Sequence, residues 1–155
     1  MRWTIDGSAI NRIATESSNY NTAFDALTDM IANSELCFCD EVVDELERTA
    51  ENEPGALWAA TVKGQRQHTG ASMTTIAWIA RNVKDVVDPA GRHDAMPSVL
   101  AHAYALAEEG QDIAVVTEDI LEKPTRRALS HACDELSIEW VQVPEWLTSC
   151  GLPWP

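Results

Sequence analysis

Four consecutive apolar residues, Ile113–Val116, form the segment that most constrains the fold. Most of them are β-branched, and such residues favour strands. A strand that is apolar on both faces is typical of a parallel sheet covered by helices on each side. The run continues into Thr117-Glu118-Asp119, so acidic side chains follow the carboxyl end of this strand.

Short apolar runs alternate with helical patterns along the rest of the chain. We expect further strands at residues 2–5, 36–39 and 138–143. Apolar spacing predicts helices between them, at residues 24–33, from 40, 56–62, 76–83, 99–110, 124–136 and after 144. Ser8 is expected to cap the first helix and Pro124 to begin another. The pattern predicts one α/β domain over residues 1–155, with a mostly parallel sheet of about four strands and helices on both faces.

Three acidic residues are expected at one edge of this sheet. Asp6 follows the first strand, Asp119 follows the third, and Glu45 lies on the helix after the second. Ligand sites of open parallel sheets lie outside the carboxyl ends of the strands. Neighbouring carboxylates repel each other unless a cation or proton intervenes, and hard oxygen ligands suit Mg²⁺ or Mn²⁺. Taken singly, each acid also fits a structural role: a strand end, a solvated helix residue or a turn cap.

Cysteine and histidine spacing gives no support for zinc or haem. The cysteines lack CxxC spacing and fit buried free thiols, and the histidines show no i, i+4 pair. These residues are Cys37, Cys39, Cys133, Cys150, His68, His93, His102 and His131. No apolar run reaches the roughly 18 residues of a membrane span, so we expect a cytoplasmic protein.

The formal net charge of −14 argues against a nucleic-acid partner over most of the chain. Residues 63–93 are the exception, with five bases and two acids. The bases are Lys63, Arg66, Arg81, Lys84 and Arg92. They predict either a phosphate-binding surface or an ordinary solvated helical surface.

The acidic positions lie in segments that resemble PIN domains. Thr4-Ile5-Asp6-Gly7-Ser8 is similar to the family's opening strand, which delivers an aspartate followed two residues later by Ser or Thr, although Gly7 departs from the usual residue. Cys39, Val42, Glu45 and Leu46 are similar to its second acidic motif, and Val115–Asp119 to its later strand. Trp146-Leu147 and Gly151-Leu152-Pro153-Trp154 resemble the close of one subgroup.

One family position differs in this chain. The family carries an aspartate just before a proline at the start of a helix, and Met96 stands there, ahead of Pro97. A thioether is a poor ligand for Mg²⁺. Asp94, two residues upstream, could supply the missing carboxylate or could only cap the helix.

The resemblance implies a three-layer fold and a Mg²⁺- or Mn²⁺-dependent endoribonuclease of the toxin-like branch, with an antitoxin protein and a second copy as partners. Asp6 and Asp119 would hold the metal, Glu45 would orient the ion or its water, and Ser8 and Thr117 would hydrogen-bond the carboxylates. The five bases named above would contact RNA.

The alternative is a catalytically silent PIN-like module that binds protein, with Trp146 and Trp154 as anchors unless they pack in the core. A small-molecule domain with a phosphorylated Asp6 is disfavoured, because no lysine follows a late strand at the position that this chemistry needs and no phosphate-binding glycine loop occurs.

Overall fold

The computed structural model describes residues 1–92 and 94–155. Its strands are β1 (Arg2–Ile5), β2 (Leu36–Cys37), β3 (Ile113–Val116) and β4 (Glu139–Val141), in the spatial order β2-β1-β3-β4. All three strand pairs are parallel. Ile5 pairs with Val116 and Thr4 with Cys37, so the central strands end at nearly the same level. The predicted α/β class and parallel sheet are therefore confirmed.

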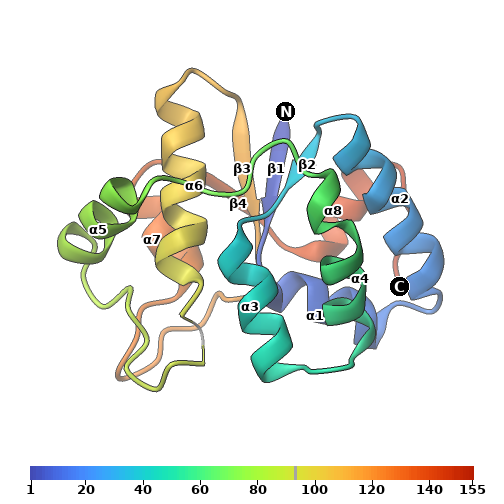
Figure 1. The fold of residues 1–155 in the computed structure, drawn as a ribbon, viewed down its shortest axis with the longest axis horizontal. Coiled ribbons are helices and arrows are strands. Elements are labelled where there is room, and N and C mark those ends of the chain that lie inside the picture. The colour runs from blue at the N-terminus through green and yellow to red at the C-terminus, as the bar shows by residue number, and fades with distance from the viewer. Residues whose placement is uncertain (93) are drawn as a thin grey trace.

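Helices cover both faces of the sheet. They are α1 (Gly7–Glu16), α2 (Tyr20–Ala32), α3 (Asp40–Thr49), α4 (Pro54–Val62), α5 (Met73–Asn82), α6 (Met96–Glu108), α7 (Leu129–Glu135) and α8 (Val143–Ser149), with a 3₁₀ turn at Lys63–Gln65. Figure 1 shows α6 and α7 on one side of the sheet and α1, α2 and α8 on the other. The sheet thus lies in the middle of three layers.

The two central strands, β1 and β3, contribute apolar side chains to the core, and Thr4 is the buried polar residue of β1. Ile5, Val115 and Val116 are 0 % exposed and belong to the same core cluster as Ile10 of α1 and Leu100 of α6. This burial on both faces is the physical reason why Ile113–Val116 lacks polar alternation. Within the described residues, no helix combines the length and apolar character that a membrane span requires.

Two predicted helix starts were wrong. The cap of α1 is Asp6, whose carboxylate accepts a hydrogen bond from the amide of Ala9 at 2.9 Å, and Ser8 lies inside the helix. The helix predicted from Pro124 begins only at Leu129. Residues before it form a turn in which the amides of Lys123 and Arg126 each donate to the other's carbonyl, and Arg126 turns toward Asp119 instead of continuing a helix.

Candidate active site at the carboxyl end of the sheet

Asp6 leaves β1 and is fixed by three hydrogen bonds. Its Oδ1 accepts from the hydroxyl of Ser8 at 2.7 Å and from the amide of Ala9, and its Oδ2 accepts from the hydroxyl of Thr117 at 2.5 Å. Burial raises the pKa of Asp6 to about 6; the hydrogen bonds oppose this shift and the charge of Asp119 adds to it. A buried carboxylate held in one orientation, with an elevated proton affinity, favours binding of a positive charge.

Glu45 reaches the same place from α3. Its side chain is almost buried, and Oε2 accepts a hydrogen bond from the amide of Ala95 at 3.0 Å. Burial raises the pKa of Glu45 to about 7, and the charges of Asp6 and Asp94 contribute to the rise. Gly7 makes room for it, because a Cβ at that position would lie 3.0 Å from Oε1 of Glu45.

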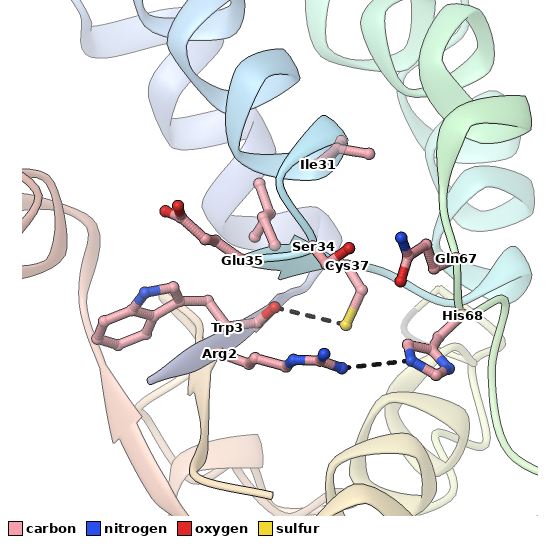
Figure 2. Close-up of a pocket in the computed structure, with 9 residues that line it drawn as sticks. Arg2, Trp3, Ile31, Ser34, Glu35, Cys37, Gln67 and His68 are labelled. Atoms are coloured by element: carbon pink, nitrogen blue, oxygen red, sulfur yellow. Dashed lines mark hydrogen bonds between the residues drawn. The ribbon is translucent and has the colours of Figure 1, made fainter.

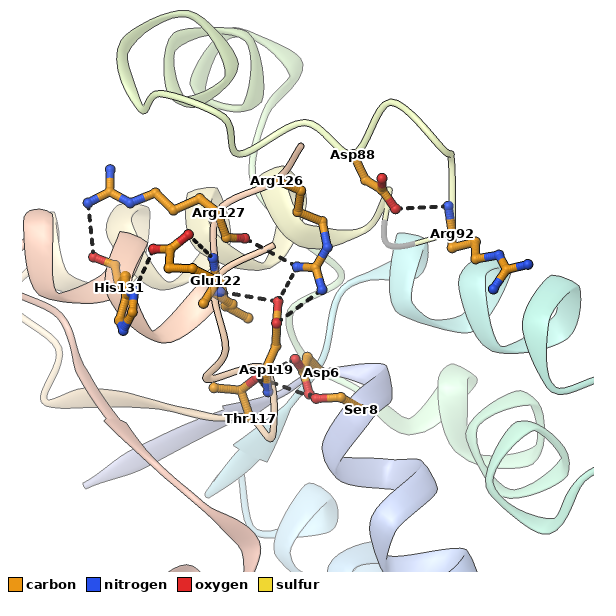
Figure 3. A network of polar contacts seen from close by, with 12 residues as sticks. Asp6, Ser8, Asp88, Arg92, Thr117, Asp119, Glu122, Arg126, Arg127 and His131 are labelled. Carbon is orange, nitrogen blue, oxygen red and sulfur yellow. Dashed lines mark hydrogen bonds and ion pairs between the residues drawn. The ribbon is translucent and has the colours of Figure 1, made fainter. Parts of the chain in front are cut away.

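Asp119 is bound by a residue that the sequence interpretation missed. Arg126 forms a two-pronged ion pair with it, with Nη1 2.6 Å from Oδ2 and Nη2 3.1 Å from Oδ1 (Figure 3). The amide of Leu129 also donates to Oδ2 at 3.1 Å. Arg126 and Asp119 side chains are only 6 % and 10 % exposed. The group of bases Lys123, Arg126 and Arg127, which closely follows Asp119 in the sequence, was the available signal.

The three predicted acids line one small cavity of about 20 Å³. Ser8 lines it as well, and its remaining wall is formed by Ala95, Met96, Val99 and Leu129. Met96 therefore contributes an apolar side chain to the wall. Asp94 instead forms an exposed ion pair with Arg48 at 2.5 Å, where both side chains are about half exposed. The structure brings Asp6, Glu45 and Asp119 together and directs Asp94 to solvent.

The donor chemistry of this cavity fits a hard divalent cation, because all its charged groups are carboxylates and two of them have raised pKa values. In the described part of the chain, however, no three His, Cys, Asp or Glu side chains are already arranged as a metal-binding group. The three carboxylates are not arranged for a metal because both oxygens of Asp119 accept hydrogen bonds from Arg126.

The five predicted RNA-binding cations do not form one patch. Arg66 is directed inward: Nη1 donates to the carbonyl of Phe38 at 2.6 Å, Nη2 pairs with Asp40 at 2.5 Å, and its side chain is 3 % exposed. Lys63 and Arg81 are exposed on the 3₁₀ turn and on α5. Lys84 lines a surface hollow with Lys123, Arg126 and Arg127, and Arg92 is exposed on the following loop. Lys84 and Lys123 thus share a hollow with Arg126, whose guanidinium contacts Asp119 of the acidic cavity. The same hollow also contains Asp85, Glu122 and Glu135.

A second cavity, of about 10 Å³, lies at the amino end of β1 and β2 (Figure 2). Arg2 Nη1 is 3.3 Å from Nε2 of His68, and the thiol of Cys37 donates to the carbonyl of Trp3 at 3.5 Å. Burial raises the pKa of Cys37 to about 11, which keeps it a neutral thiol. The prediction of buried free thiols is confirmed for Cys37, Cys39 and Cys133, whereas Cys150 is partly exposed. His93 lies outside the described residues.

A scan of the sequence against protein-family models found no match, and a search of curated proteins found none either. The interpretation of the site therefore depends on its residues and their geometry.

Proposed function

We propose that this protein is a metal-dependent endoribonuclease of the PIN type. The observation that carries the proposal is that Asp6, Glu45 and Asp119, contributed by three separate segments, line a single cavity at the carboxyl end of a parallel sheet. Three carboxylates in one buried cavity repel each other, which destabilises the fold unless a cation neutralises them. This is the arrangement that the resemblance of the sequence to PIN domains implies.

Asp6, Glu45 and Asp119 are the residues that would hold Mg²⁺ or Mn²⁺. When bound, such an ion supplies an activated water and positive charge for the hydrolysis of a phosphodiester. Ser8 and Thr117 hold the carboxylate of Asp6 in one orientation, and the amide of Ala95 does the same for Glu45. Without an ion, the pKa of Glu45 is about 7, so an ion that binds near neutral pH would displace a proton from this carboxylate.

RNA would approach over the loops that carry Lys84, Arg92 and Lys123. These three side chains are exposed, and Lys84 and Lys123 line the same hollow as Arg126, which contacts Asp119. Basic side chains next to an acidic cavity offset the repulsion between phosphates and a protein of net charge −14. A cytoplasmic location, an antitoxin partner and a homodimer belong to this proposal as well.

The decisive experiment is cleavage of a mixed RNA pool with Mn²⁺ or Mg²⁺. Asp6→Asn should reduce cleavage by about a hundredfold or more, because it removes a charged ligand while nearly preserving shape. Chelation should abolish cleavage in the wild type. Asp94→Asn is the matched control and should retain activity, because Asp94 pairs with Arg48 outside the cavity. Cleavage that survives Asp6→Asn or chelation would contradict the proposal.

A catalytically silent binding module is the second candidate, and Met96 in the cavity wall is the observation that favours it. The aromatic anchors proposed for that role are largely engaged: Trp146 is 0 % exposed and lies 6.1 Å from Trp3, while the ring of Trp154 lies 5.5 Å from the guanidinium of Arg12. A folded protein that neither cleaves RNA nor binds Mn²⁺ would support this candidate.

A further inference from the structure

We propose that Arg126 is an internal occupant of the cation site, which must release Asp119 before a divalent ion can bind all three acids. Arg126 would then be a positioning residue that sets the affinity of the site for metal. This inference deepens the proposed function and rests on its assignment of Asp6, Glu45 and Asp119 as the cation site.

The contact itself is the first argument. Two nitrogens of Arg126 engage both oxygens of Asp119, at 2.6 and 3.1 Å, which is the planar fork geometry that guanidinium and carboxylate prefer. Oδ2 of Asp119 already accepts two hydrogen bonds, from Arg126 and from the amide of Leu129, while Oδ1 keeps one lone pair beside the guanidinium. An ion at Oδ1 would therefore compete with the positive charge of Arg126 for this carboxylate. The same carboxylate forms one wall of the cavity that holds Asp6 and Glu45.

The way in which Arg126 is held is the second argument. Its side chain is almost buried, and Nη1 also donates to the carbonyl of Arg127 at 3.2 Å. The amide of Arg127 in turn donates to the carbonyl of Asp85 at 2.7 Å, which joins two loops. The guanidinium is thus held by the carbonyl of Arg127, and the backbone of Arg127 is in turn held by the loop that carries Asp85.

Charge explains why the two cations would exchange rather than coexist. Asp6 and Glu45 already share one cavity, and Met96 gives it no further carboxylate. A divalent ion there would face a buried guanidinium next to its third ligand, and like charges repel strongly in such surroundings. Release of Arg126 removes that repulsion and returns the Asp119 carboxylate to the site.

The test is Mn²⁺ affinity, measured by titration calorimetry and by the loss of the free-ion electron paramagnetic resonance signal. Arg126→Gln should bind Mn²⁺ about tenfold more tightly than the wild type, because no cation has to leave Asp119. Arg127→Gln is the matched control: it removes the same charge from the next residue, which pairs with Glu135 at 2.7 Å. It should stay within about twofold of the wild type.

Arg126→Lys covers the case in which the glutamine variant does not fold. A lysine keeps the charge but cannot form the two-pronged contact, so its Mn²⁺ affinity should rise by about threefold. Unchanged or weaker Mn²⁺ binding in a folded Arg126 variant would overturn the inference, as would an equal gain in Arg127→Gln. Tighter binding without RNA cleavage would support the exchange and count against the nuclease. Cleavage by the wild type without tighter Mn²⁺ binding in Arg126→Gln would support the nuclease and count against the exchange.

Discussion

The two ends of the parallel sheet bury opposite kinds of titratable group. At the carboxyl end, Asp6 and Glu45 have pKa values raised to about 6 and about 7. Toward the amino end, burial lowers the pKa of His102 to about 4, and the charges of His68 and Arg66 add to the shift. Helix α6 links the two regions, since Met96 lines the acidic cavity and the ring of His102 lies 6.5 Å from that of His68.

The difference between the two regions lies in how their polar atoms are satisfied. Backbone amides and hydroxyl groups donate to the carboxylates of Asp6 and Glu45. Neither ring nitrogen of His102 has a hydrogen-bond partner among the described residues. Donors aimed at an acid favour its charged form, whereas His102, without such partners, is kept neutral by burial and by the charges of His68 and Arg66.

The largest expected effect comes from breaking the ion pair at the carboxyl end. Asp119→Ala should lower the free energy of unfolding by about 3–5 kcal/mol, because it leaves the buried guanidinium of Arg126 without its partner. Urea denaturation with a chelator present measures this loss. Asp94→Ala is the control, since its pair with Arg48 is half exposed and should cost less than about 1 kcal/mol. Equal losses in the two variants would mean that the Asp119 contact is no more than a surface ion pair.

The next effect is a pH dependence of opposite sign in the two regions. The raised pKa of Glu45 makes the folded state bind its proton more tightly, so its contribution to stability falls as the pH rises from about 4 to about 7. The lowered pKa of His102 makes the unfolded state bind its proton more tightly. The contribution of His102 to stability therefore rises from about pH 4 to about pH 6.5.

Single variants separate these two contributions. We expect His102→Leu to lose stability relative to the wild type as the pH rises across this range, and Glu45→Gln to gain it. Each change should amount to about 3 kcal/mol. Urea denaturation of metal-free protein at a series of pH values measures both differences, and carboxylates common to all three proteins cancel. Parallel curves for the two variants would mean that the two regions do not titrate as described.

Local sequence patterns were sufficient for the sheet and for the convergence of the acids. The apolar run Ile113–Val116 specifies a buried strand, and parallel strands necessarily end at one edge, which brings Asp6 and Asp119 together. These are consequences of short-range patterns combined with one rule of topology.

Contacts between loops could not be predicted from short-range sequence patterns. Pro124 indicated a helix start, yet the helix begins at Leu129, because the intervening turn directs Arg126 to Asp119. Arg66 was interpreted as a surface cation because charge patterns describe exposure only on average; its guanidinium is in fact buried against Phe38 and Asp40. His102 lies on an apolar helix face, where spacing cannot reveal an unsatisfied ring.

The smallest effect tests how closely the acidic cavity is packed. A Cβ at Gly7 would lie 3.0 Å from Oε1 of Glu45, whereas one at Gly64 would have nothing within 4 Å. Gly7→Ala and Gly64→Ala both restrict the unfolded chain, which is stabilising where the backbone permits it. Only Gly7→Ala forces a buried carboxylate to move, so it should be less stable than Gly64→Ala by about 1 kcal/mol.

Displacement of the Glu45 carboxylate by Gly7→Ala should also reduce RNA cleavage at the proposed site. Glu45 cannot move freely, because the amide of Ala95 holds its other oxygen at 3.0 Å. We therefore expect Gly7→Ala to lower Mn²⁺-dependent RNA cleavage by about tenfold while Gly64→Ala leaves it unchanged. Initial rates at saturating Mn²⁺, paired with urea denaturation of both variants, measure the two effects together. Equal stability and equal cleavage in Gly7→Ala and Gly64→Ala would contradict this prediction. They would mean that Glu45 does not need its present position and that the acidic cavity tolerates substitution as an exposed surface does.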